Sequence, residues 1–428
     1  MANLEDIIDF TLFEKELDEK WICARQSPLY PELSVCSYTP DTQYACHWND
    51  VTRLSRGLVL KNEKPGVITA KSNVVARGIT KFFTLEAHGN LKLVDDDEGV
   101  DVADDVELDM NTPVVVSDKL DGCLIIAFFY DGKWNVATKG SFTSPEGLIA
   151  QRIINESKEA QEALNEIRAL IGEDCTPLFE LITPEHRHVV NYSDYEGLTF
   201  LGYVNNKSGI WFPACIDYEV LECAKLAFRI PEKLSNDKTT LGDAIVMHER
   251  EDAEGVVITT LESKQKMFKV KYSTFLKIRE VRYGITTGGA KYDVIFKVDC
   301  DKLLSDDANE AISETINSLY GELAGNPTGD YALGLFSKII EGETAPVRNE
   351  WAELAEWIEE EHWKGVDLDD RESKKRYAAL VDESGLNGRA KSLAYYLPSF
   401  EANGKLDIPN AKKSFLKMWY KGRANNYE

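Results

Sequence analysis

The residues best suited to covalent chemistry form a short run, Lys119-Leu120-Asp121-Gly122, between two apolar segments at 114–116 and 123–130. A lysine amine attacks a phosphorus centre only in its neutral form. Because a free lysine titrates near a pKa of about 10.4, a site that uses Lys119 as a nucleophile must lower that pKa. We therefore expect other cations beside it, since positive neighbours disfavour the charged amine.

Charged residues in short motifs accompany this run in a fixed order. Two carboxylates, Glu180 and Glu254, lie within or just before apolar segments, where a lone charge is costly. Lys269 and Lys271 alternate in another apolar segment, so the period of two of a β-strand places them on one face. The other motifs are Ser55–Val59 with Arg56, Thr80–Phe83 with Lys81, and Lys139–Ser141 with Lys139. One such motif recurs by chance, whereas the ordered set indicates a composite site.

These residues need strands to hold them, and residues 1–285 have the pattern of a mixed α/β domain. Apolar or alternating segments closed by turns predict strands at 114–116, 123–130, 133–138, 178–182, 198–204, 255–260 and 266–272. Asp131-Gly132 is a hairpin signal. One helix is predicted from Pro145 to Ile171, ending near Gly172. The acidic segment 95–105 is expected to be a solvated loop.

After residue 285 the pattern changes to helices separated by loops. Periodicity predicts helices at 308–323, 331–340, 347–363, 371–381 and 411–420. We therefore expect two domains, 1–285 and 286–428, the second all-helical. From Arg371 to the end, twelve Lys or Arg oppose six acidic residues, and tyrosines and a tryptophan are interleaved. This composition suits either a nucleic-acid surface or a solvated basic face.

Bulk composition limits the function classes. The formal net charge of -24 argues against a protein that coats nucleic acid non-specifically but allows a local basic site. The eight cysteines show no C-x-x-C or zinc-like spacing, which favours reduced thiols in a cytoplasmic protein. No signal peptide or membrane span is predicted. No G-x-x-x-x-G-K-[ST] motif occurs, which disfavours a P-loop ATPase.

The order of motifs resembles that of the covalent nucleotidyltransferases, the superfamily of ATP-dependent ligases and mRNA capping enzymes. Within it, R-G-L-V-L and K-F-F before K-x-D-G, and K-G-S after it, resemble the RNA ligase 1 family of the T-even phages. The resemblance covers residues 36–275. It implies an α+β fold, in which an N-terminal nucleotidyltransferase domain of ATP-grasp-like antiparallel sheets and helices precedes an all-helical domain. Cys123 stands where serine is common in the phage enzymes, a small departure.

The resemblance also implies a role for each matching residue. Lys119 would take AMP from ATP, with Asp121, Lys269 and Lys271 completing the catalytic set. Glu254 and Asp121 are candidates to hold a divalent cation, Mg²⁺ or Mn²⁺. The residues expected to bind the nucleotide are Tyr38, Arg56, Lys81, Lys119, Lys139, Glu180, Glu254, Lys269 and Lys271.

On this resemblance the chain is an ATP-dependent RNA ligase that joins 5′-phosphate and 3′-hydroxyl RNA ends through a lysyl-AMP intermediate and an RNA-adenylate. Cleaved tRNA is one expected substrate, and the helical domain is expected to choose the RNA. We expect a monomer, in the host cytoplasm if phage-encoded. Tyr203 is the candidate to stack on adenine.

Two alternatives stay open. A DNA ligase or capping-type nucleotidyltransferase usually continues with a small β-barrel, whereas here the sequence turns helical after Lys271. A non-catalytic RNA-binding protein with a ligase-like fold is the other, and the intact Lys119, Lys269 and Lys271 argue against it.

Overall fold

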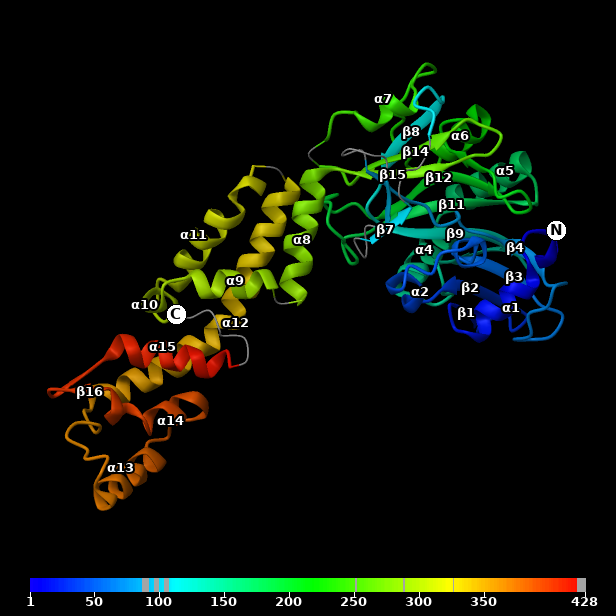
Figure 1. The fold of residues 1–428 in the computed structure, drawn as a ribbon. Helices are drawn as coiled ribbons and strands as arrows, with labels where there is room; N and C mark the ends of the chain where they lie inside the picture. Colours follow the sequence, from blue (N-terminus) through cyan, green and yellow to red (C-terminus); the bar gives the residue numbers. More distant parts are fainter. Residues whose placement is uncertain are drawn as a thin grey trace. The chain divides into compact units, whose positions relative to one another are not determined.

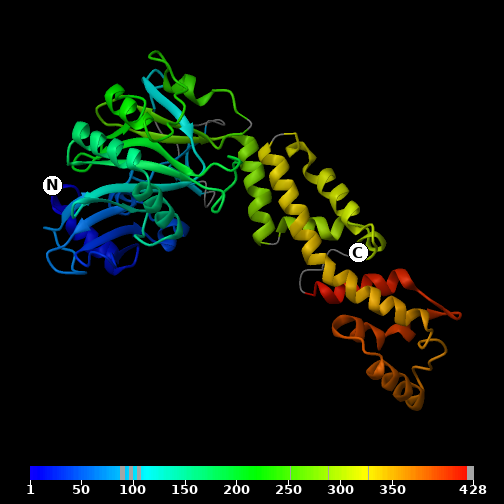
Figure 2. The same ribbon diagram turned by 180° about the vertical axis from the view of Figure 1, so that it is seen from behind.

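The structure is a computed structural model that describes residues 1–86, 92–95, 100–103, 108–250, 252–287, 289–325 and 327–421. It divides into two compact units, Met1–Phe275 and Leu276–Glu428. In Figures 1 and 2 the first unit runs from blue to green and the second from yellow-green to red. The division falls within the helix α8 (Ser273–Thr287), whose last turn contains the boundary expected near residue 285.

Two antiparallel sheets pack face to face in the first unit. The described strands of the first have the order β1-β2-β3-β4, and those of the second β10-β9-β11-β12-β13. Side chains alternate along β9, so Ile126 and Phe128 pack with the first sheet while Ile125 and Ala127 pack with helices on the opposite side. The strand bounds are β1 Ile22–Gln26, β2 Leu33–Tyr38, β3 Leu58–Lys61, β4 Asn73–Ala76, β9 Cys123–Tyr130, β10 Lys133–Ala137, β11 Cys175–Ile182, β12 Gly197–Asn205 and β13 Trp211–Pro213.

A third sheet carries the catalytic candidates. Its described strands have the order β7-β6-β5-β15-β14-β8 and are antiparallel, except that β15 and β5 are parallel. The bounds are β5 Phe83–Glu86, β6 Lys92–Asp95, β7 Val100–Ala103, β8 Val114–Lys119, β14 Gly255–Thr260 and β15 Met267–Lys271. Every strand predicted from the sequence is present, and the predicted α+β class with antiparallel sheets is confirmed.

The sequence predicted one helix after the K-G-S motif, but the structure has two, α4 (Pro145–Glu156) and α5 (Lys158–Ile171). Between them Ser157 has an extended backbone, and its side chain accepts a hydrogen bond from the Ala160 amide. A serine oxygen satisfies such an amide at a helix start, which outweighs the continuous periodicity. Both helices pack on the five-stranded sheet with α6 (Tyr218–Lys225).

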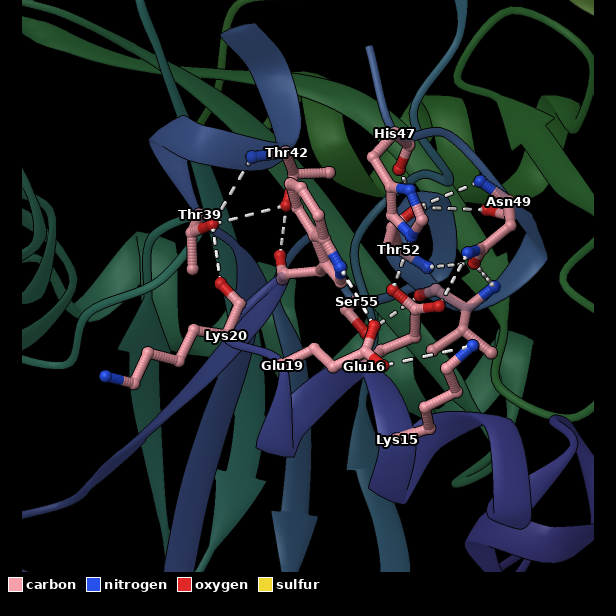
Figure 3. A network of polar contacts seen from close by, with 12 residues as sticks. Lys15, Glu16, Glu19, Lys20, Thr39, Thr42, His47, Asn49, Thr52 and Ser55 are labelled. Atoms are coloured by element: carbon pink, nitrogen blue, oxygen red, sulfur yellow. Dashed lines mark hydrogen bonds and ion pairs between the residues drawn. The ribbon is translucent and has the colours of Figure 1, made fainter. Parts of the chain in front are cut away.

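A buried carboxylate ties α1 (Phe10–Asp18) to the chain that leads into the first upstream motif. Glu16 Oε2 lies 2.9 Å from Nε2 of His47, and Glu16 Oε1 accepts a hydrogen bond from the Asn49 side chain at 3.1 Å. Asn49 in turn caps α3 (Asp50–Leu54). Figure 3 shows these polar contacts together. The other short helices of this unit are the 3-10 helix η1 (Leu4–Asp6), α2 (Pro40–Tyr44) and α7 (Leu241–Ile245).

The second unit is helical, as predicted, apart from a short hairpin of β16 (Glu401–Ala402) and β17 (Lys405–Leu406). The other helices are α9 Gly289–Lys297, α10 Cys300–Leu303, α11 Ala308–Tyr320, η2 Gly321–Leu323, α12 Pro327–Glu359, α13 Arg371–Glu383, α14 Gly388–Ala394, η3 Leu397–Phe400 and α15 Ile408–Trp419. Figures 1 and 2 show α12 running the length of the unit. None of the helices in the described residues could cross a membrane.

The long α12 corrects the sequence prediction of two helices separated by a loop. Pro346 lies inside it, where a proline removes one backbone donor and costs about 3 kcal/mol. Buried residues on both sides of the proline, among them Ile340, Val347 and Leu354, keep one apolar stripe continuous. Packing of that stripe against α11 and α14 offsets the local preference.

The aromatic core of the five-stranded sheet predicts a stability effect. The buried Phe179 ring lies 5.4 Å from that of Phe200 and 4.8 Å from that of Phe228, between centroids. Phe179→Ala should lower the free energy of unfolding of the first unit by about 3–5 kcal/mol, because it removes these contacts and leaves a cavity. Urea denaturation measures the change. The control Leu148→Ala, at a residue 57% exposed, should shift it by less than about 0.5 kcal/mol; equal effects would contradict the packing.

Candidate active site

The register of the third sheet brings the separate lysine motifs together. In β14, Gly255 pairs with Lys119 of β8 on one side and with Lys271 of β15 on the other. Glu254 therefore lies between two amines. Its Oε2 accepts a hydrogen bond from Lys119 Nζ at 2.6 Å, and its Oε1 lies 3.4 Å from Lys271 Nζ. The side chains of Lys119, Glu254 and Lys271 are only 21%, 5% and 8% exposed, so this is an enclosed charge cluster.

Two glycines allow the chain segments to approach this closely. Gly255 has a φ of +155°, and a Cβ there would lie 2.0 Å from the carbonyl oxygen of Val270. At Gly122, the glycine of the K-x-D-G run, a Cβ would lie 2.3 Å from the carbonyl oxygen of Leu181 and 3.0 Å from Cγ of Glu180. Any larger residue would push the run away from β11.

The five-stranded sheet supplies the opposite wall of the site. Glu180 of β11 pairs with Leu124 of β9, and its Oε1 accepts a hydrogen bond from the Gly122 amide at 3.2 Å. A cavity of about 200 Å³ lies between the sheets beside Lys119. We call it the lysine cavity. Its lining includes Arg56, Phe82, Lys119, Glu180, Trp211 and Val257.

Lys269 lies on the third sheet, on the face that carries Val257 and Met267 of the lysine cavity lining, although it is not itself among the described lining residues. It pairs with Val257 across β14 and β15, and paired residues of neighbouring strands project to one face of a sheet. Met267, two residues earlier on β15, lines the lysine cavity on that face. Lys269 and Lys271 are two residues apart on β15, so the predicted same-face pair is present, and Lys269 is buried.

The upstream motifs separate in space. Arg56 lines the lysine cavity, whereas the lining does not include Lys81. Lys81 is buried, with Nζ 4.9 Å from the ring centroid of Trp48 and 3.2 Å from Oδ1 of Asp95. The prediction of a solvated acidic loop is wrong for Asp95, because this carboxylate is fully buried and pairs with Lys81. Residues 96–99, 104 and 105 of that segment lie outside the described residues.

Tyr38 and Lys139 meet at a second hollow. Lys139 Nζ lies 4.6 Å from the ring centroid of Tyr38 and 3.5 Å from its hydroxyl oxygen. Both residues line a groove of about 310 Å³, and none of its described lining residues also lines the lysine cavity. Their assignment to the nucleotide stays a prediction.

Asp121 is engaged by the segment 189–192. Its Oδ2 accepts hydrogen bonds from the amides of Val189 and Val190, at 2.6 and 2.7 Å, and its own amide donates to the Tyr192 hydroxyl at 2.9 Å. These contacts hold the K-x-D-G run in place, so Asp121 acts as a positioning residue in this arrangement. Sequence reasoning missed Tyr192, since nothing local to that residue signals a contact so far along the chain.

The aromatic rings at the lysine cavity are those of Phe82 and Trp211. Tyr203 lies elsewhere, stacked on Phe212 at 4.8 Å between centroids, with its hydroxyl donating to Asp217 at 3.0 Å. Phe82 belongs to the K-F-F motif and could have been found from it. Trp211 carried no comparable signal in the sequence.

The carboxylates at the site are the candidate ligands for a divalent cation. Among the residues that the structure describes, no group of three or more His, Cys, Asp or Glu could hold a metal ion alone. Mg²⁺ commonly binds one or two protein carboxylates and completes its shell with substrate phosphates and water. Glu180, at the lysine cavity, and the nearby Glu254 fit that mode. Asp121 fits it less well, because its Oδ2 already accepts two amides.

The sequence profile of the RNA ligases of the T4 RNA ligase 1 type matches residues 54–275, more than half of the chain. The matched range contains the run at Lys119, both carboxylates and the lysine pair of β15. The chain belongs to the RNA ligase family.

Relatives of this RNA ligase family member are similar over part of their length. A protein of Autographa californica nuclear polyhedrosis virus, provisionally named a bifunctional polynucleotide kinase/RNA ligase, is 30% identical over 132 residues, covering 26% of this chain and 19% of its own. A provisionally named RNA ligase of Thermovibrio ammonificans is 23% identical over 227 residues, 52% of each chain. The chain thus spans about half or less of these relatives. The solved structure of an archaeal ATP-dependent RNA ligase matches 89% of this chain and 88% of its own, at 14% identity and a TM-score of 0.44.

Carboxylates dominate the electrostatics around Lys119 of this ligase-family chain. Burial disfavours the ammonium form, but Glu254, Glu180 and Asp121 outweigh burial and raise the pKa of Lys119. The prediction that neighbouring lysines lower this pKa is wrong for this arrangement, because Glu254 stands between Lys119 and Lys271. Burial also raises the pKa of Glu180 to about 7, although Lys119 acts in the opposite sense.

The raised pKa of Glu180 predicts a pH-dependent stability. In the unfolded chain Glu180 has the ordinary glutamate pKa of 4.5, whereas in the folded protein it keeps its proton up to about pH 7. Between these two pH values the glutamate therefore loses its proton when the protein unfolds. The unfolded state therefore binds fewer protons, and wild-type stability falls as pH rises through this window. The glutamine does not titrate. The free energy of unfolding of Glu180→Gln, relative to that of wild type, should therefore be up to about 3 kcal/mol higher above pH 7 than at pH 4.5.

Urea denaturation at several pH values measures this difference. Glu63→Gln, at an exposed glutamate of the same unit, is the control and should track wild type at every pH. A pH-independent difference for Glu180→Gln would show that folding does not raise the pKa of Glu180.

Proposed function

We propose that this chain is an ATP-dependent RNA ligase that becomes adenylylated on Lys119 and joins 5′-phosphate to 3′-hydroxyl RNA ends. The observation that carries the proposal is the enclosed cluster of Lys119, Glu254 and Lys271 beside the lysine cavity. The Lys119 amine is hydrogen-bonded to Glu254, which can act as a base, and Lys271 is a second cation beside that carboxylate. Membership of the RNA ligase family supports the reaction class.

In the first step, Nζ of Lys119 attacks the α-phosphorus of ATP, a phosphorus–nitrogen bond forms, and the bond to pyrophosphate breaks. The ammonium must first lose a proton, and Glu254, at 2.6 Å, is placed to accept it. Lys271 and Lys269 would stabilise the charge that develops on the α-phosphate and on pyrophosphate. Arg56, on the cavity wall, would hold the phosphates.

Other groups at the cavity would orient the nucleotide. The rings of Phe82 and Trp211 offer apolar surfaces for adenine. Glu180 and Glu254 would hold a divalent cation such as Mg²⁺, which supplies Lewis-acid stabilisation of phosphate charge when bound. Buried walls exclude water, which strengthens each of these electrostatic contacts.

The remaining steps move AMP and release it. An oxygen of the RNA 5′-phosphate attacks the phosphorus of the Lys119 adduct, which frees the amine and yields an RNA-adenylate. A 3′-hydroxyl then attacks the activated 5′-phosphate, a phosphodiester forms, and AMP leaves. Lys119 is thereby restored for the next cycle.

The RNA assignment is favoured over a DNA ligase or capping enzyme by the family and by the chain after β15. Helix α8 follows β15 almost directly, where those enzymes usually continue into a β-barrel. We propose that the second unit selects the RNA, with exposed Lys374, Lys375 and Arg376 of α13 as phosphate contacts and cleaved tRNA as a substrate. We further propose a monomeric, cytoplasmic enzyme.

The first test is covalent labelling. Incubated with Mg²⁺ and α-labelled ATP, the wild type should give a labelled band on a denaturing gel, and Lys119→Ala should give none, because the attacking amine is gone. Lys264→Ala, an exposed lysine of the same unit, should label like wild type. Intact mass identifies protein purified with AMP already attached. An unlabelled, AMP-free wild type that still binds RNA would favour the non-catalytic alternative.

The second test addresses the lysines of β15. Lys269→Ala and Lys271→Ala should each slow adduct formation by roughly 100-fold or more, since each removes a cation from the developing phosphate charge. Single-turnover labelling measures the rate. Lys266→Ala, exposed at the start of the same strand segment, should keep the wild-type rate. Wild-type labelling by either β15 variant would remove that lysine from the mechanism.

The third test separates RNA from DNA. A single-stranded RNA with a 5′-phosphate and a 3′-hydroxyl, and a nicked DNA duplex, are offered to the adenylylated protein. We expect sealing of the RNA at a rate at least roughly tenfold above that of DNA, as a 2′-hydroxyl distinguishes the two. Faster sealing of the DNA nick would replace the RNA assignment with the DNA ligase alternative.

A further inference from the structure

A polar groove lies on the first unit beside the K-G-S motif, apart from the lysine cavity. Its volume is about 310 Å³. Three segments form it: Arg25 on β1, the chain from Ser37 to Tyr44 at the end of β2 and along α2, and Thr138 to Ser141 after β10. We call it the Arg25 groove.

The charge of the Arg25 groove is opposite to that of the chain. The protein carries a formal net charge of -24, yet Arg25 and Lys139 line the groove and no Asp or Glu is among its described lining residues. Both cations are held in place. Arg25 Nη1 donates to the carbonyl oxygen of Gly140 at 2.6 Å, and Lys139 Nζ lies over the Tyr38 ring at 4.6 Å. Two fixed cations without a carboxylate between them suit an anion.

An exposed aromatic ring completes the groove. Tyr44 is 71% exposed although it belongs to a helix, and it lines the groove together with the largely buried Tyr38. Exposed rings beside cations are the pattern by which proteins bind single-stranded nucleic acid, because a base stacks on the ring while its phosphate meets the charge.

The groove adjoins the lysine cavity through one chain segment. A Cβ placed on Gly57 would lie 3.6 Å from Cα of Lys139, so these two backbones nearly touch. Arg56, the residue before, lines the lysine cavity. The lysine cavity and the Arg25 groove are therefore neighbours, separated by the segment of Arg56 and Gly57, so RNA whose end reaches Lys119 lies close to the groove.

We propose that the Arg25 groove binds a nucleotide of the RNA strand next to the reacting end, with a phosphate between Arg25 and Lys139 and a base on Tyr44. This rests on the proposed RNA ligase function. The triphosphate tail of ATP is the other phosphate that could reach Lys139. The exposed Tyr44 ring, which a triphosphate does not use, favours RNA.

The test measures RNA binding and nucleotide use separately in the full chain. A fluorescent single-stranded RNA with a 5′-phosphate is titrated without ATP, and its anisotropy gives Kd. Arg25→Glu should raise Kd roughly tenfold or more and flatten its dependence on salt, because a phosphate contact becomes a repulsion. Tyr44→Ala should raise Kd roughly fivefold or more through lost stacking. The KM for ATP in self-adenylylation should stay that of wild type for both.

Matched controls exclude effects of charge or surface area alone. Lys64→Glu reverses an exposed charge outside the groove, and Tyr218→Ala removes a tyrosine that is 73% exposed outside it. Both should keep the wild-type Kd for RNA. If Arg25→Glu and Tyr44→Ala also keep it, the groove does not bind RNA. If they raise only the KM for ATP, the groove holds the triphosphate tail, and the proposal is overturned.

Failure of the ligase function would look different. A wild type that forms no AMP adduct and seals no ends would refute the proposed reaction. The anisotropy experiment would still decide the groove, because it uses neither ATP nor sealing.

Discussion

Glu254 accepts a hydrogen bond from Lys119 and pairs with Lys271, and the geometry of the site depends on this shared carboxylate. The register of β8, β14 and β15 creates it, because Gly255 stands between the two lysines. A slip of one residue in any of these strands would turn its side chains to the opposite face. Each buried charge would then lose its partner, at a cost of several kcal/mol. Sheet pairing and charge pairing therefore stabilise the same arrangement.

Positive charge is concentrated where phosphate would bind, although the chain as a whole is acidic. Arg56 and Lys271 lie at or beside the lysine cavity, and Arg25 and Lys139 line the adjoining groove. The acidic balance of the chain repels a polyanion on average, so local groups of cations, these and those of α13, are the favourable positions. Local basic sites in an acidic protein would thus limit where the proposed RNA substrate binds.

Local pattern was enough to predict β8 to β12, β14 and β15, since alternating burial in a sheet leaves a period of two in the sequence, but it did not predict the strands of the first sheet. It failed where a longer contact competes with a local preference. Ser157 caps a new helix within a continuous periodic segment, and the stripe of α12 continues across Pro346. The acidic sequence around Asp95 indicated an exposed loop residue, whereas in the structure Asp95 pairs with Lys81. Each case depends on a partner that the neighbouring sequence does not reveal.

By itself, the sequence determined which residues are the candidates for the proposed chemistry. Lys119 was identified from the K-x-D-G run, and the later carboxylates and lysines from their order, because strand geometry and motif spacing are encoded locally. Only the tertiary structure decided what surrounds them. It placed Glu254 against Lys119 and so raised the pKa of the amine, engaged Asp121 with distant amides, and set Lys139 in a groove of its own. These features arise from contacts between residues far apart in the chain, and such contacts exist only once the sheets have packed.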